Sequence, residues 1–344
     1  MADDPTSRRS TAARERPPVL GVTLAVLAGV GAATQSRVNG TLADRIGSGF
    51  EAAVISFGSG LLVLTLALAL WPGARAALRR VVRGLRGEPG AGHGLGGVAP
   101  RLRWWECVGG AAGGFFVATQ GLTVGTLGVA VFIVAIVAGQ SVSSLVVDRL
   151  GLGPGGVRLI TVGRALGPVL TVAAVAVSVS GSLSAPGALG LALLPLLAGA
   201  GSSWQQAVNG RVRAVASDAP GGAAPGVCAA TFLNFLVGTA VLAVALVISL
   251  LVQGPPRGTL PSEPWLYAGG VLGIAFIAIS AAIVHRIGVL LLGLGMIAGQ
   301  VVGALLLDVV TPGVDPPGPA TYIGAVLTLV AVAAPALLHR RPAP

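Results

Sequence analysis

One stretch of sequence occurs twice in this chain, and the duplication limits what the chain can fold into. Residues 128–148 read GVAVFIVAIVAGQSVSSLVVD, and residues 288–308 read GVLLLGLGMIAGQVVGALLLD. Eight of the 21 aligned positions are identical, among them an Ala-Gly-Gln triplet and a closing Asp. Each copy has the length of about 20 residues that an apolar helix needs to cross a bilayer. Because Gln and Asp are rare here, their match at one register indicates a duplicated membrane segment.

The composition is that of an integral membrane protein. Hydrophobic residues make up 54% of the chain and charged residues only 10%, whereas soluble domains carry about 25% charged residues. The net charge of +10 comes from 22 basic residues, all of them Arg, at predicted span ends and in loops. This distribution is a topology signal and does not indicate a nucleic-acid partner. Cys107 and Cys228 have no neighbouring His, so neither a metal nor another cofactor is expected.

The apolar segments predict an all-α polytopic protein with about ten transmembrane helices. Residues 1–17 are expected to form a disordered cytoplasmic arm, and residues 73–103, with seven Arg and a Gly-rich middle, a flexible cytoplasmic loop. The spans are expected near residues 18–39, 50–71, 104–124, 128–148, 159–180, 188–209, 226–252, 265–284, 287–308 and 319–338.

The arginines predict the orientation of these spans. With the N-terminus in the cytoplasm, nineteen of the 22 Arg lie on the cytoplasmic side and three lie outside. Basic residues concentrate in cytoplasmic loops, so both termini are expected inside the cell. Residues 18–181 and 182–340 then hold five spans each. Because five is odd, the second unit would enter the membrane upside down, which predicts two inverted five-helix repeats.

Other motifs recur in the same order in both halves. They are Gln-x-x-x-Asn-Gly (35–40 and 205–210), Ser/Asn-Phe-x-x-Gly (56–60 and 234–238), Gly-Gly-x-x-Gly (109–113 and 269–273) and Gly-Gln-x7-Asp (139–148 and 299–308), with Arg-x-x-Gly (164–167) in the first half. With these motifs each half resembles the YdcZ-like family of bacterial inner-membrane exporters, which is related to the drug/metabolite transporter (EamA-like) superfamily. The resemblance implies a ten-helix drug/metabolite transporter-like fold and an export role. It covers nearly all of residues 19–338, as two fused copies.

The second half departs from the first at three positions. Ser56 is replaced by Asn234, Arg164 by Thr321, and the Gly151 that follows Asp148 by Thr311. The two halves therefore need not play equal roles.

Gln140 and Gln300 are the first candidates for substrate binding. Each lies near the middle of a predicted span, and the two spans are related by the repeat. An amide in hydrocarbon needs a partner, and transporter sites lie near the midplane between repeats. The two amides are therefore expected to face each other across a central cavity. The alternative is that each makes only an interhelical hydrogen bond.

Further polar side chains recur on the first helix of each half. Gln35 and Asn39, like Gln205 and Asn209, are four residues apart and share a helix face. They are predicted to line a polar pathway toward one leaflet, and the alternative is capping at the helix end. The remaining candidates for polar lining are Ser56, Asn234, Gln120, Ser143 and Ser144.

Three carboxylates are candidates for gating or ion coupling. Asp148 and Asp308 end equivalent spans on opposite sides of the membrane, and Glu51 opens the second span. The alternatives are a solvated loop carboxylate for each Asp and a helix-dipole contact for Glu51, as for Glu106. Arg37 is expected to anchor its helix at the outer interface.

These features favour a secondary-active exporter of small organic metabolites or drug-like solutes that works by alternating access. The chain has no HExxH, no Gly-x-Ser-x-Gly and no P-loop, so an enzyme or an ATP-driven pump is not expected. Its partners would be a small-molecule substrate, the lipid bilayer, and protons or a coupling cation. One fused chain should suffice for function. The alternative is a non-transporting membrane scaffold or assembly subunit, in which the amides only hold helices together.

Overall fold

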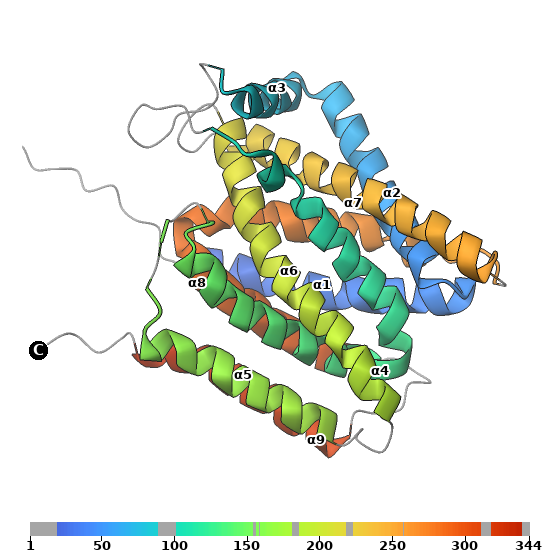
Figure 1. Cartoon of the computed structure of the whole chain (residues 1–344). Helices are drawn as coiled ribbons and strands as arrows, with labels where there is room; N and C mark the ends of the chain where they lie inside the picture. Colours follow the sequence, from blue (N-terminus) through green and yellow to red (C-terminus); the bar gives the residue numbers. More distant parts are fainter. Residues whose placement is uncertain are drawn as a thin grey trace, which may run out of the picture.

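The computed structural model describes residues 19–88, 101–153, 156–157, 159–180, 186–217, 223–256, 258–310 and 318–338. Every regular element in these ranges is helical (Figure 1). The arm expected at residues 1–17 lies outside the described residues. The elements are α1 (Val19–Ile46), α2 (Gly49–Leu70), α3 (Pro72–Arg86), η1 (Trp104–Cys107), α4 (Gly109–Arg149), α5 (Val162–Ser180), α6 (Pro186–Ala216), α7 (Ala223–Gln253), η2 (Pro264–Tyr267), α8 (Gly269–Val310) and α9 (Pro319–Leu338).

The described helices confirm a multi-pass membrane protein. Six helical stretches in the described part are long and apolar enough to cross a membrane, and two of them, Trp104–Val129 and Val131–Arg149, follow each other through α4. At the end of the first stretch Gly128 interrupts the helical geometry with φ 74° and ψ 161°. A positive φ is easily adopted by Gly because it has no Cβ. Two of the expected spans are therefore joined at a glycine break, and the total of ten remains a prediction.

The segment 73–103, expected to be a flexible loop, begins with a well-formed helix. In α3, Pro72 occupies the first turn and Gly87 ends the helix in the left-handed conformation, with φ 69°, which are the usual start and stop signals. Small and apolar residues of α3 are buried, whereas Arg79 and Arg83 are exposed. Because the segment is rich in Arg, its composition suggests a loop, although its buried residues recur with the amphipathic period of 3.6 residues. Residues 89–100, with the Gly-rich middle, lie outside the described residues.

Helices of the first repeat pack mainly against helices of the second. α1 lies along α8, α4 along α6, and α5 along α9 (Figure 1). At the first two contacts the backbones touch through glycines at equivalent positions. A Cβ on Gly139 of α4 would overlap the carbonyl oxygen of Leu196 in α6, and a Cβ on Gly299 of α8 would overlap that of Val26 in α1. Small residues are what allow membrane helices to approach this closely.

The large apolar side chains form both the interior and the outer surface. Phe57, Phe132 and Phe235 are among the buried residues of the largest apolar cluster, while α7 leaves Val244 and Leu251 widely exposed. In a soluble protein such a surface would promote aggregation. In a bilayer it is the surface that meets the lipid chains.

We predict that Gly139→Ala destabilises the fold, because its methyl group must push α4 away from α6. Overpacking of this kind costs about 1–3 kcal/mol, so the thermal midpoint of the detergent-solubilised protein should fall. Gly58→Ala is the matched control, because a Cβ there meets no atom within 4 Å and Ala favours a helix over Gly. An equal loss of stability in both variants would contradict the close backbone contact.

Candidate functional site

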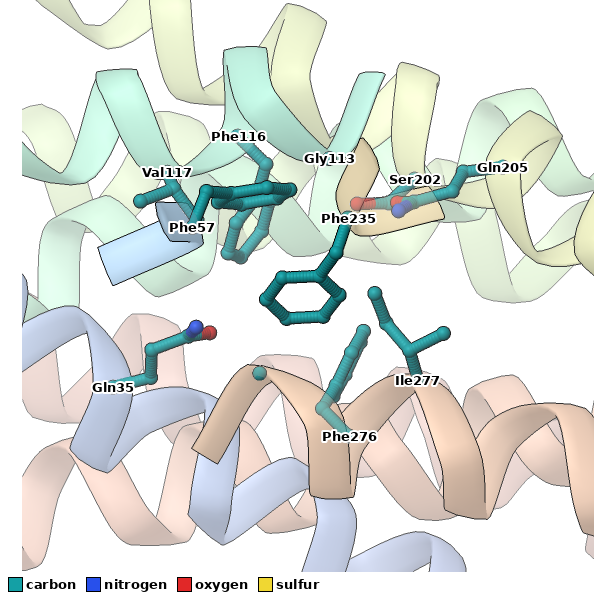
Figure 2. A pocket seen from close by; sticks show the side chains of 11 residues that line it. Gln35, Phe57, Gly113, Phe116, Val117, Ser202, Gln205, Phe235, Phe276 and Ile277 are labelled. Atoms are coloured by element: carbon teal, nitrogen blue, oxygen red, sulfur yellow. The ribbon is translucent and has the colours of Figure 1, made fainter. Parts of the chain in front are cut away.

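A small cavity of about 20 Å³ lies between the two repeats (Figure 2). That volume is enough for about one water molecule. The cavity is mainly apolar, and the eleven described residues that line it include no charged side chain. They come from α1, α2, α4, α6, α7 and α8, and are Gln35, Phe57, Gly113, Phe116, Val117, Ser202, Gln205, Phe235, Gly273, Phe276 and Ile277.

The lining residues come in pairs that the internal repeat makes equivalent. Ten of the eleven fall into five such pairs: Gln35 with Gln205, Phe57 with Phe235, Gly113 with Gly273, Phe116 with Phe276, and Val117 with Ile277. Ser202, the remaining residue, corresponds to Ala32. The cavity is therefore formed by both repeats, with nearly equal contributions from each.

Aromatic rings supply most of the wall. Phe57 and Phe235 stack on each other with ring centroids 4.8 Å apart and an interplanar angle of 29°. Each ring occupies space that a glycine leaves open, Gly238 for Phe57 and Gly60 for Phe235. The Phe-x-x-Gly motif is thus explained by packing, since the glycine of each copy admits the Phe of the other.

In the first repeat, the candidate amides belong to a buried hydrogen-bond network. Asn39 Nδ2 donates to Gln120 Oε1 at 2.6 Å, and Gln120 Nε2 donates to Ser36 Oγ at 2.9 Å. Gln35 Nε2 donates to the backbone carbonyl of Gly269 at 2.9 Å. Gln35 therefore joins α1 to the start of α8, with its amide toward the cavity (Figure 2).

In the second repeat, the corresponding network runs through Asn234. Gln205 Nε2 donates to Asn234 Oδ1 at 3.1 Å, and Asn234 Nδ2 donates to Asn209 Oδ1 at 3.3 Å. The equivalent of Asn234 is Ser56, whose buried Oγ finds no partner among the described residues. Of the predicted polar residues in these two networks, Gln35 and Gln205 thus line the cavity, while Asn39, Asn209, Asn234 and Ser56 lie behind it.

Gln140 and Gln300 do not line this cavity. Gln300 is fully buried, and neither its Nε2 nor its Oε1 has a hydrogen-bond partner among the described residues. Gln140 is 6% exposed, and its Nε2 also has no partner there. Both follow the glycines at which α4 meets α6 and α8 meets α1. A buried amide without a hydrogen-bond partner costs free energy, so the burial of these two Gln side chains lowers the stability of the fold.

The candidate carboxylates lie away from the cavity. Asp308 is buried and forms an ion pair with Arg37, so Arg37 joins α1 to α8 instead of acting only as an interfacial anchor. Asp148 is buried at the end of the second stretch of α4. Glu51 is partly buried in the first turn of α2, where a carboxylate is favoured by the helix dipole.

Sequence reasoning did not assign the phenylalanines to the site. Phe57, Phe116, Phe235 and Phe276 were visible as matched positions of the repeat. Because Phe is ordinary in an apolar helix, its match between the halves indicates duplication and does not by itself indicate a site. Gln120 was considered as polar lining, but it belongs to the network behind the cavity.

A family model supports the resemblance seen in the motifs. The model described as "Putative inner membrane exporter, YdcZ" matches residues 20–177 and again residues 190–334. The chain belongs to this family. The two separate matches are consistent with two fused YdcZ copies, and the family is one of inner-membrane exporters, which is a class of transport proteins and not of enzymes.

Two further comparisons add to this result. None of the curated proteins matches the YdcZ-type chain in sequence. A solved structure described only as "Crystal structure of protein" is 19% identical to it and has a TM-score of 0.55. The alignment covers 96% of this chain and 99% of that one. At this identity the likeness concerns the fold alone.

We predict that Asp308→Asn destabilises the protein, because the partly buried Arg37 then loses the buried carboxylate with which it pairs. Breaking a buried pair costs about 3–5 kcal/mol, which should appear as a lower unfolding midpoint in detergent. The double variant R37Q/D308N should recover part of the loss. Glu263→Gln is the control, since its pair with Arg45 is exposed, with an N–O distance of 3.5 Å, and contributes less than about 1 kcal/mol. Equal effects of D308N and E263Q would contradict this role.

Proposed function

We propose that this chain is a secondary-active exporter that moves a small organic solute across the inner membrane by alternating access. The cavity lined by repeat-related pairs carries the proposal. A site on the axis between two repeats can open to either side of the membrane. The repeats rock relative to each other, from one packing arrangement to the symmetry-related one. The family assignment supports a membrane exporter, and the mechanism is our inference.

The architecture we propose is ten spans in two inverted five-helix repeats. The repeat-related contacts support it: Gly110 would meet the backbone of Asn234 if it carried a Cβ, and Gly270 would meet that of Ser56. Gly110 corresponds to Gly270, and Asn234 to Ser56. The same contact thus occurs twice, with the roles of the two repeats exchanged, as a two-fold pseudo-axis requires.

The cavity lining favours an uncharged solute with an aromatic or aliphatic body. Four Phe rings offer apolar and stacking contacts, and the two Gln amides offer a donor and an acceptor at facing walls. A formal charge would be costly to desolvate because no opposite charge lines the cavity. The cavity of about 20 Å³ must widen to admit such a solute, so substrate binding would accompany a movement of the repeats.

We assign gating to the carboxylates at the helix ends. The Arg37–Asp308 pair ties α1 to α8, and this contact has to loosen for the repeats to separate there. Asp148 would act at the opposite mouth, and Glu51 near the start of α2. Protonation or cation binding at these groups would supply the coupling to an ion gradient, since no carboxylate lines the cavity.

We predict that Gln35→Leu and Gln205→Leu each weaken solute binding roughly tenfold, the effect of losing one hydrogen bond to a desolvated polar group. Binding would be measured by thermal shift against panels of uncharged aromatic solutes and of organic cations, because a ligand that binds only the native state raises the midpoint. Gln206→Leu is the matched control, because Gln206 neighbours Gln205 without lining the cavity. A shift of the midpoint with the uncharged solutes alone would support the uncharged substrate class, and a shift with the organic cations alone would support a cationic one.

The scaffold alternative predicts a different pattern. Under that reading no solute shifts the midpoint, and Q35L and Q205L lower the stability of the protein with no ligand present. A variant that folds as well as wild type, binds no solute and transports none in proteoliposomes supports the exporter.

We predict that both termini lie in the cytoplasm. Cys107 and Cys228 would first be replaced by Ser, and a single Cys placed at position 10 or position 342. A membrane-impermeant maleimide should label neither position in intact spheroplasts and both in inside-out vesicles. Labelling of one terminus from each side would require an odd number of spans and would exclude the inverted-repeat topology.

A further inference from the structure

A second, much larger hollow lies at one end of the bundle, where η1, α3 and α6 meet. It has a volume of about 970 Å³, and its lining is half polar and half apolar. The polar half comes from Arg101, Arg103 and Arg211, with Glu106. The apolar part includes Leu85, Leu150 and Leu152, beside Trp104 and Trp105. We call it the interfacial hollow; it shares no residue with the central cavity.

The interfacial hollow carries an excess of positive charge. Glu106, the one carboxylate among the lining residues that the structure describes, is 1% exposed and already engaged. Glu106 Oε1 lies 2.5 Å from Arg211 Nε, and its Oε2 accepts from the backbone N–H of Arg103 at 2.7 Å. The exposed guanidinium groups of Arg101 and Arg103 are not neutralised by it. Planar guanidinium groups suit a phosphate, which can accept two parallel hydrogen bonds from one of them.

The walls of the hollow are held in place by several contacts. Leu102 N donates to the carbonyl oxygen of Gly84 in α3 at 3.2 Å, and Arg80 donates to that of Ala216 in α6 at 2.9 Å. The backbone that presents Arg101 and Arg103 is thereby fixed between α3 and α6. A ligand binding here would not have to order a loose segment first, which favours affinity.

Aromatic and apolar side chains place the hollow at the level of the lipid headgroups. Trp104, the first residue of the apolar stretch Trp104–Val129, is 73% exposed, and Trp concentrates at the membrane–water interface. The amphipathic helix α3, with Arg79 and Arg83 exposed, is of the type that lies along such an interface. Leu150, 62% exposed, adds apolar surface. A soluble anion would leave this apolar half of the hollow uncovered.

We propose that the interfacial hollow binds one phospholipid with a net negative headgroup. Its phosphodiester would lie between Arg101 and Arg103, and its upper acyl chain would cover Trp104 and Leu150. Because Arg103 precedes α4 and Arg211 belongs to α6, the bound lipid would also stabilise the contact between these two helices. The assignment of this lipid site does not rest on the proposed transport activity.

The test measures lipid retained by the purified full-length chain. The protein would be reconstituted in phosphatidylcholine nanodiscs with increasing phosphatidylglycerol, then released in non-ionic detergent for native mass spectrometry. Wild type should retain one phosphatidylglycerol. At about fivefold per arginine, R101Q/R103Q should bind it roughly 25-fold more weakly. R79Q/R83Q, which removes the same charge from α3 outside the hollow, should bind it like wild type.

Other results would overturn the proposal. Equal losses in the two double variants would mean diffuse attraction to the basic surface without a site, and undiminished retention in R101Q/R103Q would exclude these arginines. Displacement of the lipid by millimolar inorganic phosphate would make the hollow a site for a soluble anion.

R101K/R103K keeps the charge and should bind better than R101Q/R103Q. Matching thermal midpoints in lipid-free detergent would show that the variants fold.

Discussion

The structure depends on backbone-to-backbone contact between helices of opposite repeats. In lipid there is no hydrophobic force to bring apolar helices together, so close packing has to hold them. Gly29 and Gly299 provide it where α1 meets α8, and Gly199 and Gly139 provide it where α6 meets α4. All four are related by the internal repeat. Because the first helix of each repeat packs against the other repeat, and both repeats line the cavity, neither half can form the cavity alone.

The two repeats keep the same number of amides behind the cavity but place them on different helices. The first repeat has Gln120 on α4 and Ser56 on α2, and the second has Ser280 on α8 and Asn234 on α7. In the second repeat Asn234 therefore holds Gln205, whereas Gln35 bonds a backbone carbonyl instead. The two walls of the cavity differ chemically, and an asymmetric solute would bind in one orientation.

The duplication made much of this arrangement predictable. It identified which residues are equivalent, and Gln35 and Gln205 were recognised as site candidates from their shared motif. It did not place Gln140 and Gln300, because a helical period says which residues share a face but not which neighbour that face meets. Helix α3 was missed because its many Arg and flanking glycines suggested a loop. The Phe walls were missed because only their packing distinguishes them from other apolar residues.

The absence of charge on the cavity lining limits how the proposed transport cycle can be driven. Free energy from an ion gradient would have to enter at charged groups outside the cavity. The Arg37–Asp308 pair joins α1 to α8, and the Glu106–Arg211 pair joins η1, which directly precedes α4, to α6. These are the same helix pairs that the glycines hold in contact. A change of charge at either pair would therefore act directly on the packing that encloses the cavity, without any charge having to reach the substrate.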